Sequence, residues 1–252
     1  MVIVLTALGS STSALQAFQS SLDTSAANLA NVDTNAFKSR SAIFQDLPYL
    51  GPLARQIGEG VEVGAITSDF SQGKTPQTGK DLDLAVQGQG YFSLLTSSGT
   101  TQYTRDGSFH LNAIGQLVST DGLAVQPSIT FPPNVLSTKI AVDGTVSVLT
   151  ASSPETPIVL GQLRLTNFAN PQGLNAIGSN RFLATDSSGL PLTNLPGTNG
   201  LGLIAQGSLE QSNVDATTEM VRLVNTSRDY TVNSRALKVE DEIVKGGLDL
   251  VV

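Results

Sequence analysis

Residues 8–29 read LGSSTSALQAFQSSLDTSAANL, and in this stretch leucine returns at every seventh position. The leucines are Leu8, Leu15, Leu22 and Leu29, and Phe18 lies on the same stripe. A seven-residue apolar repeat is typical of a helix that packs along another helix. The pattern predicts a helix within positions 3–30, and a stretch of about 24 helical residues would be about 36 Å long. It is expected to end in the turn-forming run NVDTN at 31–35.

A second apolar ladder lies near the other end of the chain. Its members recur at the same seven-residue step, with Met220 on the same side: Leu223, Tyr230, Leu237 and Val244. Asn213 or Asp215 is placed to cap this helix. Gly246 and Gly247 are expected to weaken or end it, since two glycines cost roughly 2 kcal/mol against alanine.

The two ladders allow more than one arrangement. They pair either with each other in one molecule or with copies of themselves in a polymer. A third possibility is that both helices pack on a β core, because amphipathic helices of that kind show similar periodicity. Residues 3–30 are also rich in serine and threonine, which are mediocre helix formers. The first helix is therefore expected to be marginal when it is alone and to need a partner.

The middle of the chain, from about 37 to 207, has the pattern of β structure. Short apolar alternations are separated by Asp-Gly pairs at 106–107, 121–122 and 143–144, and these pairs predict hairpin turns. The proline- and glycine-rich stretch 190–202 predicts an irregular loop. The predicted fold is α+β, with discontinuous N- and C-terminal helices forming a coiled-coil core domain around a mostly antiparallel β middle. The predicted domains are 1–45 with 208–252, and 46–207.

Composition excludes several classes of function. The chain has 252 residues, a formal charge of −7 and a pI of about 4.6, which argues against nucleic-acid binding. One histidine and no cysteine leave no disulfide and no Cys/His metal cluster. The apolar run at 2–8 is too short to cross a bilayer, which takes about 20 residues. It also lacks the basic start and cleavage site of a secretory signal peptide.

A few polar residues are candidates for chemistry, but each has a simpler structural interpretation. Asp81 and Asp83 share one face of a strand-like segment and resemble an acid/base pair; solvated edge charges are the favoured interpretation. Asp106 next to Arg105 suggests an ion pair, although a turn aspartate explains it equally well. His110 has no nucleophile beside it and is interpreted as a structural or surface residue. The sequence thus predicts no catalytic, cofactor or metal site.

Several blocks resemble the bacterial flagellar axial proteins, the rod and hook family. They are ANLANVDTNAFK at 27–38, GQGYF at 88–92, YTRDGSF at 103–109, GQLV at 115–118 and GSLEQSNV at 207–214. They cover nearly the whole chain in the family's order. Length, IFQDL at 43–47 and the block at 173–180 make the chain most similar to the distal rod subunits.

Two departures from the family pattern carry predictions. Ala36 stands where the family usually has glycine, and alanine is expected to narrow the backbone angles allowed in that turn. The segment 48–60 looks shorter than in typical distal rod proteins, and it is expected to lie on a contact between subunits.

The resemblance implies a structural subunit and not an enzyme. The terminal helices would form the inner core of a hollow helical tube, with the β domain outside, and the tube would carry motor torque to the hook. The implied partners are copies of the chain itself, other rod subunits, the hook protein, the P- and L-ring proteins and the flagellar type III export apparatus. No cofactor, nucleic acid or membrane insertion is implied. The implied location is the flagellar basal body across the periplasm, reached by export without a cleaved signal peptide.

The predicted assembly interface combines the two ladders with the signature segment. It comprises Leu8, Leu15, Phe18, Leu22, Asn28, Leu29, Asn31, Asn35, Phe37, Met220, Leu223, Tyr230, Leu237 and Val244. Two alternatives stay open: a proximal rod or hook-type subunit, and a secreted β-rich carbohydrate-active enzyme that uses Asp81, Asp83 or Asp106.

Overall fold

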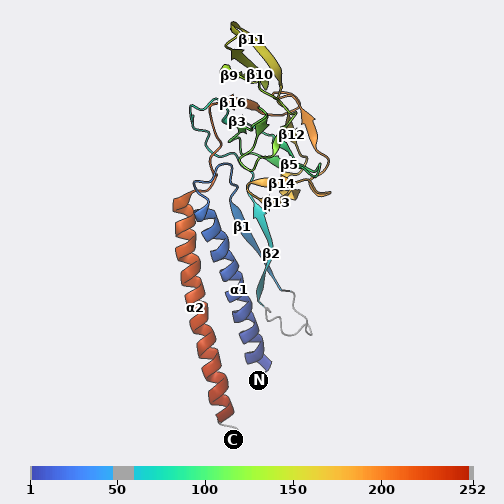
Figure 1. The fold of residues 1–252 in the computed structure, drawn as a ribbon. Coiled ribbons are helices and arrows are strands. Elements are labelled where there is room, and N and C mark those ends of the chain that lie inside the picture. The colour runs from blue at the N-terminus through green and yellow to red at the C-terminus, as the bar shows by residue number, and fades with distance from the viewer. Residues whose placement is uncertain (1, 48–59, 250–252) are drawn as a thin grey trace. The chain divides into compact units, whose positions relative to one another are not determined.

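A computed structural model describes residues 2–47 and 60–249, and their side chains over 9–47 and 60–246. The described chain forms two compact units (Figure 1). The helical unit contains the residues up to 32, residues 39–69 and the residues from 214 onward; the β unit contains 33–38 and 70–213. The predicted helical domain ended its first part at residue 45, whereas the helical unit extends to residue 69. Residues 33–38, predicted to belong with the helices, lie in the β unit.

The helical unit holds two long helices and a hairpin. Helix α1 (Val2–Ala30) runs beside α2 (Ala216–Asp249), as Figure 1 shows in blue and orange-red. The antiparallel strands β1 (Arg40–Asp46) and β2 (Val61–Ser68) also contact α1. The end of α1 at Ala30 confirms the predicted boundary. Residues 48–59, which bear most of the segment predicted to contact another subunit, lie outside the described residues.

Packing explains why a sequence rich in serine and threonine is helical here, since α1 contacts α2, β1 and β2. The Ser20 hydroxyl donates to the Gln16 carbonyl at 3.1 Å, and the Thr24 hydroxyl donates to the Ser20 carbonyl at 2.7 Å. These bonds satisfy the hydroxyls but slightly destabilise a helix, so the stability of α1 depends on its neighbours.

The ends of α2 agree only in part with the prediction. The Asp215 carboxylate accepts the Thr218 N–H at 2.7 Å, so Asp215 is the N-cap. At the other end, α2 continues through Gly246 and Gly247 to Asp249. The glycine pair does not end the helix, because glycine lowers helix propensity without excluding helical backbone angles.

The β unit is built from short antiparallel strands, which confirms the predicted mostly antiparallel middle. A seven-stranded sheet has the order β13-β14-β5-β4-β8-β7-β6, and a three-stranded sheet has the order β11-β10-β9. Two further strand pairs, β12-β15 and β16-β3, also belong to the β unit. The strands are β3 (Leu84–Gln87), β4 (Phe92–Leu95), β5 (Thr101–Thr104), β6 (His110–Leu111), β7 (Leu117–Val118), β8 (Ala124–Gln126), β9 (Val135–Ile140), β10 (Thr145–Thr150), β11 (Ser153–Gln162), β12 (Leu165–Asn167), β13 (Asn175–Gly178), β14 (Arg181–Leu183), β15 (Leu192–Asn194) and β16 (Leu203–Gln206), with a 3-10 turn at Pro171–Gly173.

Two of the three predicted Asp-Gly hairpins are present. The pair at 143–144 joins β9 to β10 and the pair at 121–122 joins β7 to β8, with positive φ at both glycines. The third prediction is wrong, since β5 and β6 do not pair with each other. Gly107 serves a close approach instead: its carbonyl accepts the Leu84 N–H at 3.0 Å, and a Cβ at 107 would collide with the Leu84 carbonyl. The predicted irregular loop at 190–202 contains the short strand β15.

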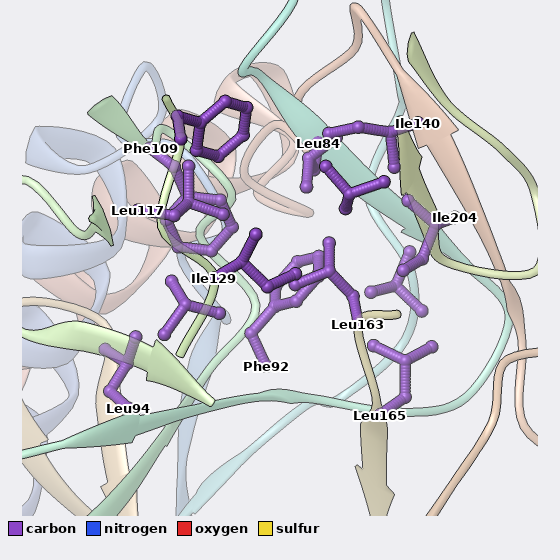
Figure 2. Close-up of a cluster of buried hydrophobic side chains, with 14 of the residues drawn as sticks. Leu84, Phe92, Leu94, Phe109, Leu117, Ile129, Ile140, Leu163, Leu165 and Ile204 are labelled. Carbon is purple, nitrogen blue, oxygen red and sulfur yellow. The ribbon is translucent and has the colours of Figure 1, made fainter. Parts of the chain in front are cut away.

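The core of the β unit is apolar and closely packed. Figure 2 shows side chains from separate segments pointing toward one another, among them Leu84, Phe92, Leu163 and Ile204. The Phe92 and Phe109 rings meet edge to face at 5.1 Å. A second buried cluster is mostly aromatic and consists of Tyr91, Tyr103, Phe168, Leu174 and Phe182, with Phe70 packed against it.

The turn around Ala36 keeps a conformation that suits glycine. Ala36 is buried and has a φ of +56°, in the left-handed region that side chains disfavour. The residue thus adopts the left-handed angle despite its Cβ, and the prediction that alanine narrows the angles allowed in this turn stays a prediction. The surrounding contacts hold Ala36 at that angle: the Ala36 N–H donates to the Glu210 carbonyl at 2.7 Å.

Candidate assembly site

One face of α2 is partly covered along its length. Its half-buried residues alternate at steps of three and four, as in a heptad repeat, and are Leu223, Thr226, Tyr230, Asn233, Leu237, Glu240 and Val244. We call this set the α1-facing row. The Asn233 amide donates to the Ser11 carbonyl at 2.9 Å, and the Ser11 hydroxyl donates to the Glu240 carboxylate at 3.2 Å. These contacts place the row against α1.

The predicted ladder of α1 is half-buried in the same unit. Its described members are Leu15, Phe18, Leu22 and Leu29. The side chain of Leu8 lies outside the described residues. Phe18 and Thr226 line a groove of about 390 Å³, together with Phe44 of β1. The four predicted α2 residues Leu223, Tyr230, Leu237 and Val244 therefore lie on a face that packs in the same molecule.

A second apolar stripe of α2 lies away from this row. Met220 is 53% exposed and does not join the α1-facing row. The other members of the exposed stripe are Val221, Val224, Val232, Val239 and Ile243. An exposed apolar stripe along a helix is unusual for a protein that stays monomeric and typical of an association surface.

The signature segment at 27–38 makes specific contacts. Asn28 is fully buried in α1: its amide donates to the Arg40 carbonyl at 2.7 Å, and its carbonyl accepts the Arg40 N–H at 2.9 Å. Asn31 donates to the Ala27 carbonyl at 2.8 Å. In the β unit, the Asn35 carbonyl accepts the Asn180 amide at 2.6 Å, and Phe37 is buried. Asn28 thus takes the place of a strand partner at the start of β1.

Replacing Asn28 with alanine is expected to destabilise the start of β1. Both backbone groups of the exposed Arg40 lose their side-chain partner; each hydrogen bond contributes about 0.5–1.5 kcal/mol net, so the two together contribute about 1–3 kcal/mol. Hydrogen exchange of the β1 amides should become faster by one to two orders of magnitude, about the factor that this cost implies. The control is Asn225→Ala at an exposed position of α2, which should leave β1 unchanged. Unchanged exchange in Asn28→Ala would show that this contact does not hold the strand.

A buried ionic cluster lies inside the β unit. Lys38 Nζ is 2.6 Å from Glu210 Oε1, and Arg105 Nη1 is 3.4 Å from Glu210 Oε2. The side chains of Lys38, Arg105 and Glu210 are 2%, 6% and 0% exposed. We call these three residues the junction network. Neither Arg105 nor Glu210 belongs to the predicted interface, and Lys38 entered only as part of the signature.

The candidates for catalysis do not come together. Asp81 is exposed, whereas Asp83 is buried, so the interpretation of both as solvated edge charges is wrong for Asp83. Asp106 accepts the Ser108 N–H at 3.0 Å, which confirms a turn aspartate. His110 is exposed on β6. Within the described residues, no group of three or more His, Asp or Glu is placed to hold a metal ion. None of the helices described is both long and apolar enough to cross a membrane.

Comparison with known proteins agrees with this arrangement of terminal helices and β middle. Residues 8–38 match the family model described as flagella basal body rod protein, and residues 85–148 match the flagellar hook protein FlgE/F/G D1 domain. Residues 205–250 match the flagellar basal body rod FlgEFG protein C-terminal model. The flagellar basal-body rod protein FlgG of Borreliella burgdorferi is 39% identical over 257 residues, which cover 96% of this chain and 97% of the relative. The chain belongs to the flagellar basal-body rod protein family.

Further relatives place the chain within the rod family. FlgG of Bacillus subtilis is 36% identical over 260 residues, covering 96% of this chain and 97% of the relative. The flagellar hook protein FlgE of Escherichia coli is 23% identical, covering 94% of this chain and 98% of the relative. The chain is accordingly a structural component of the bacterial flagellar basal body, of the distal rod type, and not an enzyme.

No local sequence pattern identifies the members of the junction network as a set. Lys38 and Glu210 are 172 positions apart, and no spacing rule pairs residues across such a distance. The blocks at 27–38, 103–109 and 207–214, on which the family resemblance rests, each contribute one member of the junction network. Their meeting point is visible only in the fold.

Proposed function

We propose that this subunit polymerises into the hollow helical drive shaft of the distal rod, with its terminal helices forming a coiled-coil core and its β unit outside. The observation that carries the proposal is that α2 bears apolar residues on two of its faces. The α1-facing row packs within the subunit, and the stripe formed by Met220, Val221, Val224, Val232, Val239 and Ile243 remains exposed. A helix with two apolar faces is suited to a bundle of helices from several subunits.

The exposed stripe provides enough contact for a tube. It extends over 24 residues of α2, from 220 to 243, or about 36 Å of helix. When one face of a subunit meets a different face of the next, the contact does not form a two-fold symmetric dimer. Such a contact builds an open helical polymer where the rotation between subunits does not close into a ring. The predicted assembly residues Leu15, Phe18, Leu22 and Leu29 would then stabilise each subunit's helix pair within that polymer.

The proposed partners follow from the same role. They are copies of the chain, other rod subunits, the hook protein, and the P- and L-ring proteins around the rod. Delivery by the flagellar type III export apparatus fits helices rich in serine and threonine, because such helices order only when they pack. Proximal rod or hook-type assembly is the alternative within the family, and the observation that favours it is the 23% identity to a hook protein over 94% of this chain.

Proteolysis of the isolated subunit and of the assembled rod tests this proposal. In the isolated subunit we expect trimming of roughly the first 30 to 45 and the last 35 to 40 residues, because lone helices of this composition are marginal. The β unit should resist. In purified basal bodies the same sites should be protected. Equal resistance of the ends in both states would contradict ordering of the helices by assembly.

A further inference from the structure

Three separate segments of the chain meet inside the β unit. They are 34–38, 70–74 and 207–213, and each continues directly into the helical unit at one end. The Asn213 N–H donates to the Phe37 carbonyl at 3.4 Å, and the Gln211 N–H donates to the Lys74 carbonyl at 2.8 Å. These are the segments through which the chain enters and leaves the β unit.

The Glu210 carboxylate contacts both of the other segments and the body of the β unit. Oε1 accepts Lys38 Nζ from the first segment at 2.6 Å and the Gly73 N–H from the second at 3.0 Å. Oε2 faces Arg105 at 3.4 Å, just beyond β5. A single side chain of the third segment thus contacts the first, the second and the body of the unit. Charge-assisted bonds of this kind are stronger than neutral ones.

The charge balance makes Glu210 the critical member of the junction network. Two buried cations share one carboxylate. Backbone carbonyls assist: Ser71 accepts Lys38 Nζ at 2.7 Å, and Gly88 accepts Arg105 Nη1 at 2.8 Å. Arg105 also lies 5.1 Å from the Tyr91 ring. Burial raises the pKa of Tyr91 to about 12, so Tyr91 stays neutral at physiological pH and does not supply a second anion.

We propose that Glu210 is a positioning residue whose charge fixes the three connecting segments to the β unit, so that this unit turns with the rest of the subunit when the rod rotates. The rotation rests on the proposed function. The fixing of the segments does not, and it is testable on the purified protein.

The first test measures local opening with a reporter thiol. The chain has no cysteine, so a single introduced one reports its own exposure. Ser208→Cys places a thiol at a buried position of the third segment, and Ser93→Cys places one at a buried position of β4. In a Glu210→Gln background, Ser208→Cys should be labelled at least about a hundredfold faster, because the buried cations lose their counter-charge. Ser93→Cys should keep its rate. An unchanged rate at 208 overturns the proposal, and an equal increase at both positions shows that Glu210 holds the whole fold instead.

A second variant separates charge from shape. Lys38→Met removes one of the two cations that contact the Glu210 carboxylate, whereas Glu210→Gln removes the carboxylate that contacts both. Labelling at 208 should rise only a few-fold in Lys38→Met, and the double variant should lie below Glu210→Gln alone, since it lacks one of the two buried cations that have lost this carboxylate. If Lys38→Met opens the segment as much as Glu210→Gln, the charge of Glu210 is not what fixes it.

Motility under load tests the rotational part. Cells carrying Glu210→Gln should build rods and hooks but lose most of their swimming speed in a viscous medium, where torque is high. Normal speed in that medium, with the thiol result as expected, would refute the torque role alone. Failure of the wild-type chain to enter rods would refute the proposed function and leave the thiol result intact.

Discussion

Replacing Leu237 with aspartate is expected to abolish rod assembly while the β unit stays folded. Leu237 is half-buried in the α1-facing row, with Glu240 one turn away. An unpaired carboxylate in the face where α1 and α2 pack costs several kcal/mol, and this cost recurs in every subunit of the polymer. Leu22→Asp on α1 should act in the same way. Cells should export the subunit, lack hooks and fail to swim, and the purified protein should keep its β circular dichroism.

Matched controls separate charge from position. Ala236→Asp and Gln16→Asp place the same carboxylate on exposed positions of the same helices and should be far milder. Ser20→Asp on α1 would be a weaker control, because Ser20 is half-buried and not exposed. Swimming cells with Leu22→Asp or Leu237→Asp would refute the coiled-coil core. Loss of the β fold in either variant would instead support helices that pack on the β unit.

Replacing Phe92 with alanine is expected to destabilise the β unit itself, whereas Leu237→Asp leaves that unit folded. Phe92 is fully buried at the centre of the core in Figure 2 and meets Phe109 edge to face. Removing a buried phenyl ring leaves a cavity and costs about 3–5 kcal/mol. The free energy of unfolding of the β unit, measured by urea denaturation, should fall by that amount, and cells should lack rods because the subunit is degraded.

Ile114→Ala is the control for this second experiment, since Ile114 is 68% exposed. Its free energy of unfolding should change by less than about 0.5 kcal/mol. A loss below about 1 kcal/mol in Phe92→Ala would mean that the cluster around Phe92 does not determine the stability of the β unit.

Periodicity and turn chemistry were predictable because they are local. The seven-residue ladders predicted the existence of α1 and α2, and the sequence offered Asn213 or Asp215 as the cap of α2, of which the structure has Asp215. Gly246 and Gly247 misled because propensity is a weak preference that neighbouring helical turns override. The pair at 106–107 misled because its glycine is required by contact with Leu84, which is distant in sequence.

Long-range pairing was not predictable from one sequence. The residues of β1 are mostly exposed, and the strand carries too few apolar residues for the sequence to show that the β1–β2 hairpin packs with the helices. The burial of Asp83 and the partnership of Lys38, Arg105 and Glu210 depend on which segments the topology brings together. The family resemblance supplied the function because its blocks span the chain, yet it assigned no role to Glu210.

The most direct test of the central claim, that this chain is a subunit of the distal rod, is electron microscopy of basal bodies with the subunit labelled. The turn at Gly99, between β4 and β5, has open space around it and accepts a short epitope tag. Antibody label is expected along the rod on the side nearest the hook, in repeated copies. Label on the filament, on the hook alone or nowhere in the basal body would contradict the account.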